Sequence, residues 1–341
     1  MSRQRRVLII KLASMGDLVH LLPALTDAKK ADPNIIFDWV VDTHFAEVAS
    51  WHPAVHNIFL TNHRKWRSSL FTKKTRSEFS ALMNQLKSNS YDLIIDAQGN
   101  LKTALLSLLI QGKTVGFDSS STPEWGSHFF YGKKVSSSKS LHAISRLREL
   151  FAGALDYQLP PTAPDYQIDI DKLTPPSISI PPAYLFFVPI ASFSSKLWPD
   201  GSWDQLITQA TIFNYPIFIP WGNEKERQRA LKLSHHTNVL VLPKLSLSEI
   251  GYLLLHAKAV ISVDTGLSHI AAALSTPCIT LYGATDPALT GTLGENQTTL
   301  TSSCSCLGKR TCTQPKESFC LLQITPLRVI TELHKLLKLS P

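Results

Sequence analysis

The sequence predicts an α/β protein built from two doubly wound domains, each with a parallel sheet, and three observations support this. The 341 residues exceed the roughly 100–200 of a typical single domain. In both halves, apolar β-rich runs alternate with amphipathic segments, which is typical of parallel sheets. Between the two series lies a proline-rich stretch without clear periodicity at 161–182, which indicates a linker.

The expected boundaries follow from this alternation. We predict an N-terminal domain at 1–160, the linker at 161–182, a C-terminal domain at 183–323 and a terminal helix at 324–341. Thr325 and Pro326 supply the cap and the first residue of that helix. Packing of this helix back on the N-terminal domain is one arrangement that we consider.

Each domain contains its elements in regular order. In the first half, strands are expected at 6–10, 35–42, 55–61, 91–99 and 113–117, and helices at 17–31, 45–51, 77–87, 101–110 and 140–155. In the second half, strands are expected at 184–190, 215–222, 238–243, 259–264 and 277–283, and helices at 203–213, 224–234, 246–257 and 267–275. Two such domains on a short linker leave a cleft between their sheet edges, and clefts between domains are preferred ligand sites.

Composition narrows the class of protein. Hydrophobic residues make up 44% and charged residues 18% of the chain, as in a globular protein, and no apolar run reaches the ~20 residues of a membrane-spanning helix. The apolar run at 7–10 is broken at Lys11, so it is shorter than the roughly 7–15 residues of a secretory signal. We therefore expect a cytoplasmic protein whose five cysteines stay reduced.

The net charge of +8 admits nucleic acid, anionic lipid headgroups or a phosphorylated substrate as partners. Residues 63–76 carry six Lys or Arg and no acid, with Trp66 and Phe71 between them. This run is either a solvated basic loop or a patch for polyanions or an anionic membrane surface. No recognised DNA- or RNA-binding motif is present, so we expect no nucleic-acid partner.

Asp17 follows Gly16 where the first strand passes into a helix. The carboxylate is either a helix cap, worth about 0.5–2 kcal/mol, or a general base that faces a substrate hydroxyl. The residue alone does not decide between these two interpretations.

Three turns that follow strands of the second half carry candidate ligand-binding groups. Asp264-Thr265-Gly266 ends a buried strand, where exposed amides can bind a diphosphate, and His269 lies one turn into the next helix. Lys196 can neutralise a leaving diphosphate and Glu226 can bind ribose hydroxyls. Helix caps, a turn glycine and solvated surface charges are the alternative interpretations. Because Asp17 and the basic run belong to the other half, the arrangement favours a transferase.

Several stretches, in order, carry a resemblance to a known family: KLASMGDLVHLLPALTDA, FDWVVD, RKWR, YDLIIDAQGNLK, HAISRLRELFA, KLWP, PWGNEKER, LPKLSLSEI, SVDTGLSHIAAAL and YGATDPALTG. The chain resembles the lipopolysaccharide heptosyltransferases of glycosyltransferase family 9, most closely the heptosyltransferase I group. The resemblance implies a GT-B fold and inverting, metal-independent transfer of L-glycero-D-manno-heptose from ADP-heptose to a Kdo residue of Kdo-lipid A. It also implies a monomer, peripheral on the cytoplasmic face of the inner membrane, with that anionic surface as a partner.

The resemblance also implies residue roles. Asp17 becomes the general base and Lys196 a catalytic counter-ion to the diphosphate. The implied donor-binding residues are Ser192, Lys196, Glu226, Leu245, Asp264, Thr265, Gly266 and His269, and the implied acceptor-binding residues are Ser14, Gly16, Arg64, Lys65, Arg67, Gln98 and His142. The chain departs from the family pattern at Ala191-Ser192, Ser68 and Pro123.

Other interpretations stay open at this point. Transfer of a second heptose or of another ADP-sugar would use nearly the same donor motifs, and a non-catalytic two-domain binding protein would need Asp17 only as a cap. A nicotinamide dehydrogenase is disfavoured because the first strand–helix turn lacks GxGxxG. The cysteines at 304, 306, 312 and 320 lack the CxxC…CxxC spacing of a zinc site, so we expect no metal there.

Overall fold

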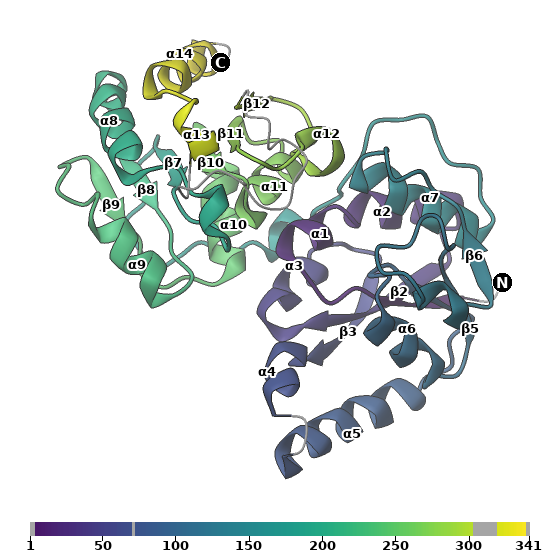
Figure 1. Cartoon of the computed structure of the whole chain (residues 1–341). Helices are drawn as coiled ribbons and strands as arrows, with labels where there is room; N and C mark the ends of the chain where they lie inside the picture. The colour runs from purple at the N-terminus through teal and green to yellow at the C-terminus, as the bar shows by residue number, and fades with distance from the viewer. Residues whose placement is uncertain (1–3, 70–71, 303–318, 339–341) are drawn as a thin grey trace. The chain divides into compact units, whose positions relative to one another are not determined.

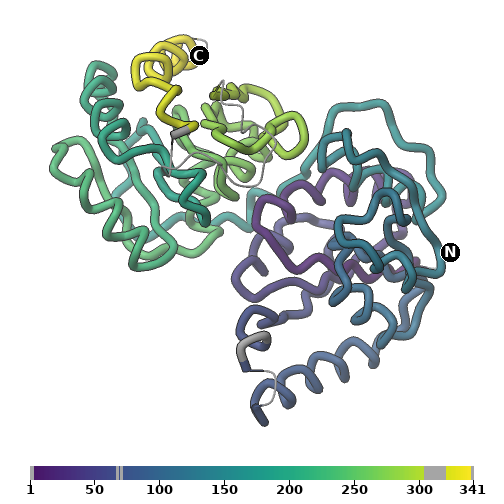
Figure 2. The backbone as a smooth tube through the Cα atoms, viewed as in Figure 1, coloured from purple at the N-terminus to yellow at the C-terminus, as the bar shows by residue number. Residues whose placement is uncertain are grey.

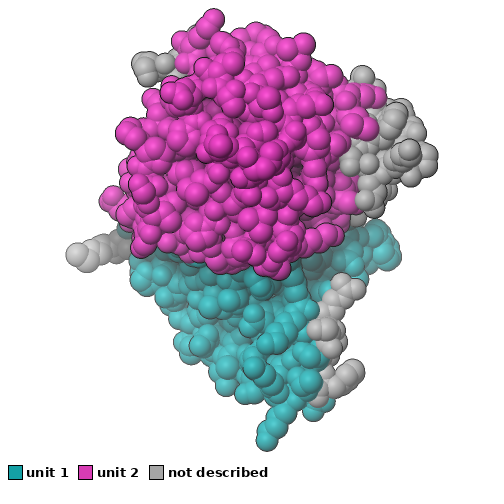
Figure 3. All heavy atoms as spheres, turned by 90° about the vertical axis from the view of Figure 1, so that its left-hand side faces the viewer, with its two compact units in different colours: residues 1–169 teal, residues 170–341 magenta. Residues whose placement is uncertain are grey.

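The computed structural model describes residues 4–69, 72–302 and 319–338, with the side chains of 67, 68 and 319 excepted. The chain divides into two compact units, Met1–Asp169 and Ile170–Pro341, which are coloured separately in Figure 3. The division falls inside the proline-rich stretch at 161–182. Figure 2 traces the chain from the first unit into the second.

The first unit is an α/β layer structure around one parallel sheet of six strands, in the order β3-β2-β1-β4-β5-β6 (Figure 1). Its strands are β1 (Arg5–Ile10), β2 (Ile35–Asp42), β3 (Val55–Thr61), β4 (Leu93–Asp96), β5 (Lys113–Phe117) and β6 (Lys133–Val135). Its helices are α1 (Met15–Val19), α2 (Leu22–Ala31), α3 (Ala46–Ser50), α4 (His63–Ser68), α5 (Lys73–Lys87), α6 (Leu101–Leu108) and α7 (Ala143–Leu155), with 3-10 turns η1 (Thr43–Phe45) and η2 (Ser127–Phe130).

The two faces of this sheet are covered by different helices. On one face, α5 and the residues after α6 pack their apolar side chains, Leu82, Leu86 and Ile110, against β1, β2 and β4. Helices α2 and α7 pack against each other, and a buried ion pair between Arg148 and Asp27 joins them at 2.6 Å. The strand order reverses beside β1, so the loops after β1 and β4 lie together at one edge, where open α/β sheets bind ligands.

The second unit repeats the plan with a parallel sheet in the order β12-β11-β10-β7-β8-β9. Its strands are β7 (Leu185–Val188), β8 (Ile217–Ile219), β9 (Val239–Val241), β10 (Ala259–Val263), β11 (Cys278–Tyr282) and β12 (Gln297–Thr301). Its helices are α8 (Asp200–Ala210), α9 (Glu224–Leu231), α10 (Leu247–His256), α11 (Gly266–Ala273), α12 (Pro287–Thr290), α13 (Phe319–Leu322) and α14 (Pro326–Lys338), with 3-10 turns η3 (Ile170–Lys172), η4 (Ser194–Lys196) and η5 (Thr211–Phe213). Both sheets confirm the predicted α/β class.

The terminal helix α14 packs within the second unit. Its apolar face, Val329, Ile330 and Leu333, is buried in the core of the second unit together with Trp203 and Leu206 of α8. The helix packs on α8, β10 and β11. The spacing of the leucines predicted a buried face but not the surface that buries it.

Other differences lie at element boundaries. The helix expected at 17–31 is two helices, because the chain breaks at residues 20–21 and α2 restarts with Pro23 in its first turn. Helix α5 begins earlier than expected, at Lys73, since the Thr72 side chain accepts a hydrogen bond from the Thr75 amide. The edge strands β6 and β12 were not predicted from the sequence.

Candidate functional site

Lys196, Asp264 and His269 come together in the second unit. β7 and β10 are neighbours in the sheet, so the loops that follow them meet at its carboxyl edge. There the Lys196 Nζ lies 2.6 Å from Asp264 Oδ2, and the His269 Nε2 lies 3.9 Å from Asp264 Oδ1. The Asp264 side chain is only 6% exposed, whereas that of Lys196 is 32% exposed. The lysine is therefore both paired and open to a ligand.

Thr265 and Gly266 occupy the N-terminus of α11. Thr265 is the N-cap residue, with extended backbone, and its side chain makes no capping hydrogen bond. The amides at a helix N-terminus have no partners within the helix and, with the helix dipole, favour an anion. This geometry is suited to a diphosphate beside Lys196.

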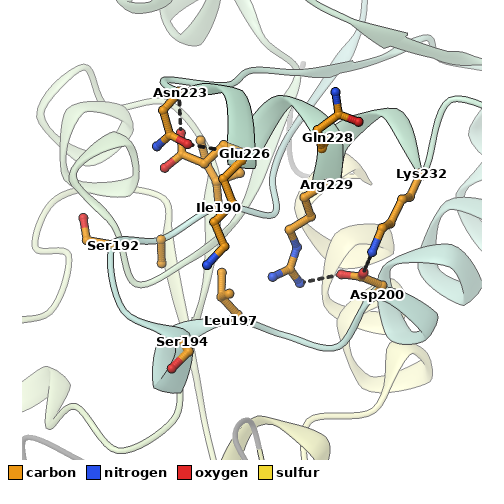
Figure 4. A pocket seen from close by; sticks show the side chains of 12 residues that line it. Ile190, Ser192, Ser194, Leu197, Asp200, Asn223, Glu226, Gln228, Arg229 and Lys232 are labelled. Atoms are coloured by element: carbon orange, nitrogen blue, oxygen red, sulfur yellow. Dashed lines mark hydrogen bonds and ion pairs between the residues drawn. The ribbon is translucent and has the colours of Figure 1, made fainter.

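A cavity of about 620 Å³ opens between the loop after β7 and helix α9 (Figure 4). Its volume lies within the range of about 300–1,000 Å³ that small-molecule sites occupy. The predicted donor residues Ser192 and Glu226 line it. The full lining is Ile190, Ala191, Ser192, Ser194, Leu197, Asp200, Asn223, Lys225, Glu226, Gln228, Arg229 and Lys232.

The cations of α9 in this cavity were missed by the sequence analysis. Figure 4 shows Arg229 and Lys232 pointing toward Asp200, at 2.8 and 3.4 Å. Burial lowers the pKa of Arg229, and the nearby Asp200 carboxylate acts against that shift. The run EKERQRALK contained these residues, but its periodicity gave no sign of which face meets the loop after β7.

Glu226 has a structural role in addition to its place in the cavity wall. Its Oε2 accepts hydrogen bonds from the backbone amides of Gly222 at 2.7 Å and Asn223 at 3.2 Å, while the Asn223 side chain accepts from the Glu226 amide. This is a capping box that fixes the start of α9. Leu245 precedes α10, is half-buried and does not line the cavity.

In the first unit, Asp17 lies on α1 and caps it. The Asp17 Oδ2 accepts hydrogen bonds from both the amide and the hydroxyl of Ser14, each at 2.8 Å. Ser14 is exposed and Gly16 is buried within the same turn. The interpretation of Asp17 as a helix cap is therefore correct. The Asp17 carboxylate is also half-exposed, at the end of β1.

A buried lysine beside Asp17 was not among the predicted site residues. The Lys11 Nζ donates to the carbonyl of Ala97 at 3.1 Å, in the loop after β4. Burial lowers the pKa of Lys11, and the carboxylates of Asp17 and Asp96 act against that shift. The pairing of β1 with β4 thus places a buried amine near the Asp17 carboxylate.

A second cavity, of about 730 Å³, opens next to this turn. The Gln98 Oε1 accepts hydrogen bonds from the amides of Leu12 and Ala13, at 3.1 and 3.3 Å, and so fixes the backbone that leads to Asp17. Basic and apolar groups share its wall. The lining is Leu12, Ala13, Thr61, His63, Arg64, Trp66, Phe79, Leu82, Gln98, Asn100, Lys102 and Leu106.

The basic run contributes unevenly to this cavity. Arg64 lines it, with its guanidinium 5.5 Å from the centre of the Phe45 ring. Lys65 is exposed on α4 and is not part of the lining. The side chain of Arg67 lies outside the described residues. Lys102, which the sequence analysis did not select, adds a second cation from α6.

His63 is held beside two other polar groups at the end of β2. Its Nδ1 lies 2.9 Å from Asp42 Oδ2, and the His44 Nδ1 lies 2.7 Å from Asp42 Oδ1. Burial lowers the pKa of His63, the Asp42 carboxylate opposes this shift, and Arg64 and Lys102 add to it. At neutral pH His63 is therefore mostly the uncharged imidazole.

His142 does not line this cavity. It caps α7 by accepting a hydrogen bond from the Ile144 amide at 3.2 Å, and its ring centre lies 5.5 Å from that of the buried His20, at the end of α1. Of the predicted acceptor residues, Gln98 and Arg64 thus meet in one cavity, whereas His142 lies with α1.

Among the described residues, Asp204, His235 and His236 form a group whose ligand atoms lie within 4.8 Å of one another. Both histidine Nε2 atoms already lie within hydrogen-bond distance of the same Asp204 oxygen, at 3.0 and 2.8 Å, which is an arrangement that needs no ion. The predicted cysteines 304, 306 and 312 lie outside the described residues, and Cys320 is buried in α13.

Comparison with known proteins defines the class. The family model described as glycosyltransferase family 9 (heptosyltransferase) matches residues 79–319, and the chain belongs to this family. It is 40% identical to the lipopolysaccharide heptosyltransferase 1 of Pseudomonas aeruginosa over 97% of this chain and 98% of that protein. It is 43% identical to the Escherichia coli K12 protein of the same name, over 86% of this chain and 92% of that one.

The structure agrees with these relationships. The E. coli heptosyltransferase WaaC with ADP superimposes with a TM-score of 0.86, at 39% identity, over 97% of this chain and 99% of that one. The same enzyme with ADP-2-deoxy-2-fluoro heptose gives a TM-score of 0.84 at 38% identity, over the same shares of both chains. The fold is therefore of the GT-B type, as the resemblance implied.

Proposed function

We propose that this protein is a lipopolysaccharide heptosyltransferase of type 1, which moves L-glycero-D-manno-heptose from ADP-heptose to a Kdo residue of Kdo-lipid A. The observation that carries the proposal is the match of nearly the whole chain to relatives with this name and to a solved structure with an ADP-heptose analogue. The two sites described above supply a charge pattern that fits the reaction.

On the donor side, Lys196, the α11 N-terminus and the cations of the 620 Å³ cavity form a positive environment for a diphosphate. As the bond between the anomeric carbon and the diphosphate breaks, negative charge grows on the leaving oxygen. Lys196 and the amides of Thr265 and Gly266 stabilise that charge as it develops. Asp264 positions Lys196 and binds heptose hydroxyls in this proposal.

On the acceptor side, Asp17 takes the proton from the attacking hydroxyl while the new carbon–oxygen bond forms on the face opposite the diphosphate. This single displacement inverts the anomeric centre and produces ADP and the glycosylated acceptor. Arg64 and Lys102 in the 730 Å³ cavity bind carboxylates or phosphates of the acceptor. No step requires a metal ion, because the counter-ions to the diphosphate are side chains and amides.

The lipid acceptor implies that the protein works at the cytoplasmic face of an anionic inner membrane. The proposed association is peripheral, with a monomer as the working unit. Among the described residues, no helix is long and apolar enough to cross a membrane.

A transfer assay with two acceptors tests the proposal. ADP-heptose is incubated, without added metal, with Kdo-lipid A lacking heptose or with the same acceptor already carrying one heptose. We expect a mass gain of one heptose residue on the first acceptor only. Transfer solely to the second would instead support the alternative function of a heptosyltransferase II, and tight donor binding without transfer to either would indicate another acceptor.

A further inference from the structure

Helix α6 exposes its apolar face to solvent. Four leucines, three within the helix and one at its C-cap, share its outer side, and the inner side is made of small and polar residues. The outer set is Leu101, Leu105, Leu108 and Leu109, which are 36%, 50%, 52% and 49% exposed. The inner set is Thr103, Ala104 and Ser107, which are fully buried. A surface helix of a globular protein normally has the opposite pattern.

Two exposed aromatic rings lie on the neighbouring turn. Trp125 is 76% exposed and Phe129 is 66% exposed, and their ring centres are 5.9 Å apart in an edge-to-face arrangement. Because η2 packs against α6, these rings and the four leucines belong to one surface. We call Leu101, Leu105, Leu108, Leu109, Trp125 and Phe129 the α6 patch.

The aromatic turn is fixed to α6 by hydrogen bonds. The hydroxyls of Thr122 and Ser127 both donate to the carbonyl of Gly99, at 3.1 and 3.2 Å. The Glu124 carboxylate accepts from the Leu101 amide at 3.0 Å, at the first residue of α6. These hydrogen bonds hold the turn against the start of α6, so the fold itself keeps the two rings exposed.

The segment that contains the patch is rich in basic residues. Residues 62–139, which contain α4, α5, α6 and η2, carry twelve Lys or Arg and five Asp or Glu, a net charge of +7. The other residues of the first unit carry eight and ten, a net charge of −2. The excess positive charge of this unit is thus confined to the segment that exposes the apolar side chains.

The patch is also continuous with the acceptor cavity. Lys102 and Leu106 of α6 line the 730 Å³ cavity, next to the exposed Leu101 and Leu105. A lipid whose polar part enters the cavity would leave its acyl chains beside these leucines.

We propose that the α6 patch docks on a lipid bilayer with anionic headgroups, with Trp125 and Phe129 entering the interface. Aromatic rings favour the boundary between headgroups and acyl chains, and basic residues around an apolar face strengthen binding to anionic lipid. The location of this surface rests on the exposed side chains, and only its use during catalysis rests on the proposed function.

Vesicle sedimentation tests the docking surface without catalysis. The full chain is mixed with vesicles of phosphatidylethanolamine and phosphatidylglycerol, or of phosphatidylcholine alone. We expect binding to the anionic vesicles, and at least a tenfold loss of it in the double variant Trp125→Ser, Phe129→Ser. Ile212→Ser is the control, because Ile212 is also 66% exposed but lies in the second unit, and it should bind like the wild type.

Two further measurements separate the possible failures. Transfer to a de-acylated, water-soluble acceptor should be unchanged in the double variant if the protein is folded and the proposed function is correct, whereas transfer to vesicle-bound acceptor should fall. Equal vesicle binding by the double variant and the wild type would overturn the proposal. The proposal would also be overturned if sedimentation velocity showed a dimeric wild type and a monomeric double variant while vesicle binding was unchanged. The α6 patch would then join two copies of this chain.

Discussion

Replacing Lys196 by Met removes the cation nearest to a nearly buried carboxylate. In the wild type the Lys196 Nζ is 2.6 Å from Asp264 Oδ2, and the next basic group is the His269 Nε2, 3.9 Å from the other oxygen. Removing one partner of a buried pair costs about 3–5 kcal/mol. Since Lys196 is one-third exposed and water can enter its place, we expect a loss near the lower end, about 3 kcal/mol.

The control is Lys232→Met. Lys232 also faces an aspartate, at 3.4 Å from Asp200, but both side chains are well exposed, at 68% and 43%. Removal of such a surface pair should cost only about 0–1 kcal/mol. The free energy of unfolding of each variant is measured by urea denaturation, with calorimetry to separate the two units.

A double-mutant cycle isolates the pair itself. Asp264→Asn, Lys196→Met and the double variant should show a coupling energy of about 1–3 kcal/mol, because the carboxylate is no longer left unpaired in the double variant. In parallel, ADP affinity measured by calorimetry should fall roughly tenfold or more in Lys196→Met, since a charge-assisted hydrogen bond contributes about 1.5–3 kcal/mol. Additive stabilities, with Lys196→Met no worse than Lys232→Met, would refute this reasoning.

Three other predictions address the first unit and the terminal helix. Burial lowers the pKa of His63 in the folded protein below the ordinary value of 6.5. Between that lowered pKa and 6.5 the unfolded chain binds more protons than the folded one, so the free energy of unfolding rises with pH through this range. An NMR titration, with the His63 signal assigned from His63→Gln, should give a midpoint below 6.5, and a higher midpoint would contradict the geometry. Arg148→Met leaves Asp27 buried without its partner and should cost about 3–5 kcal/mol in urea unfolding. Leu333→Ala, at a fully buried position of α14, should cost about 2–5 kcal/mol, whereas a smaller loss than that of the exposed control Leu327→Ala would show that α14 is not docked.

Much of the fold could be predicted because its signals are local. Each buried parallel strand is a short apolar run, and the turn after the first strand carries Asp17, which caps the next helix. The edge strands β6 and β12 were not predicted because they are short and mostly polar, with the sequences KKV and QTTLT. Their pairing depends on the neighbouring strand, which no local pattern shows.

The site was harder to predict because it depends on which loops meet. In the sequence, Lys11 only interrupts an apolar run. In the structure, the pairing of β1 with β4 buries it against Ala97 and near Asp17. Likewise, Arg229 lines the 620 Å³ cavity only because α9 lies next to the loop after β7. The outward leucines of α6 were read as an ordinary amphipathic helix, because periodicity shows that a face exists and not whether it points inward.

The role of Asp17 is the central claim, and its hydrogen bonds from Ser14 show why a single observation cannot decide it. Asn can still accept both bonds through its amide oxygen, so Asp17→Asn should keep α1 capped while removing the basic carboxylate. The variant therefore separates a cap from a catalytic base.

The most direct measurement is heptose transfer from ADP-heptose to a de-acylated Kdo-lipid A acceptor, without added metal, by the wild type and by Asp17→Asn. Our account predicts transfer by the wild type and a loss of several orders of magnitude in the variant, with ADP-heptose affinity and thermal stability close to those of the wild type. Near-normal transfer by Asp17→Asn would contradict the account and leave Asp17 as a helix cap.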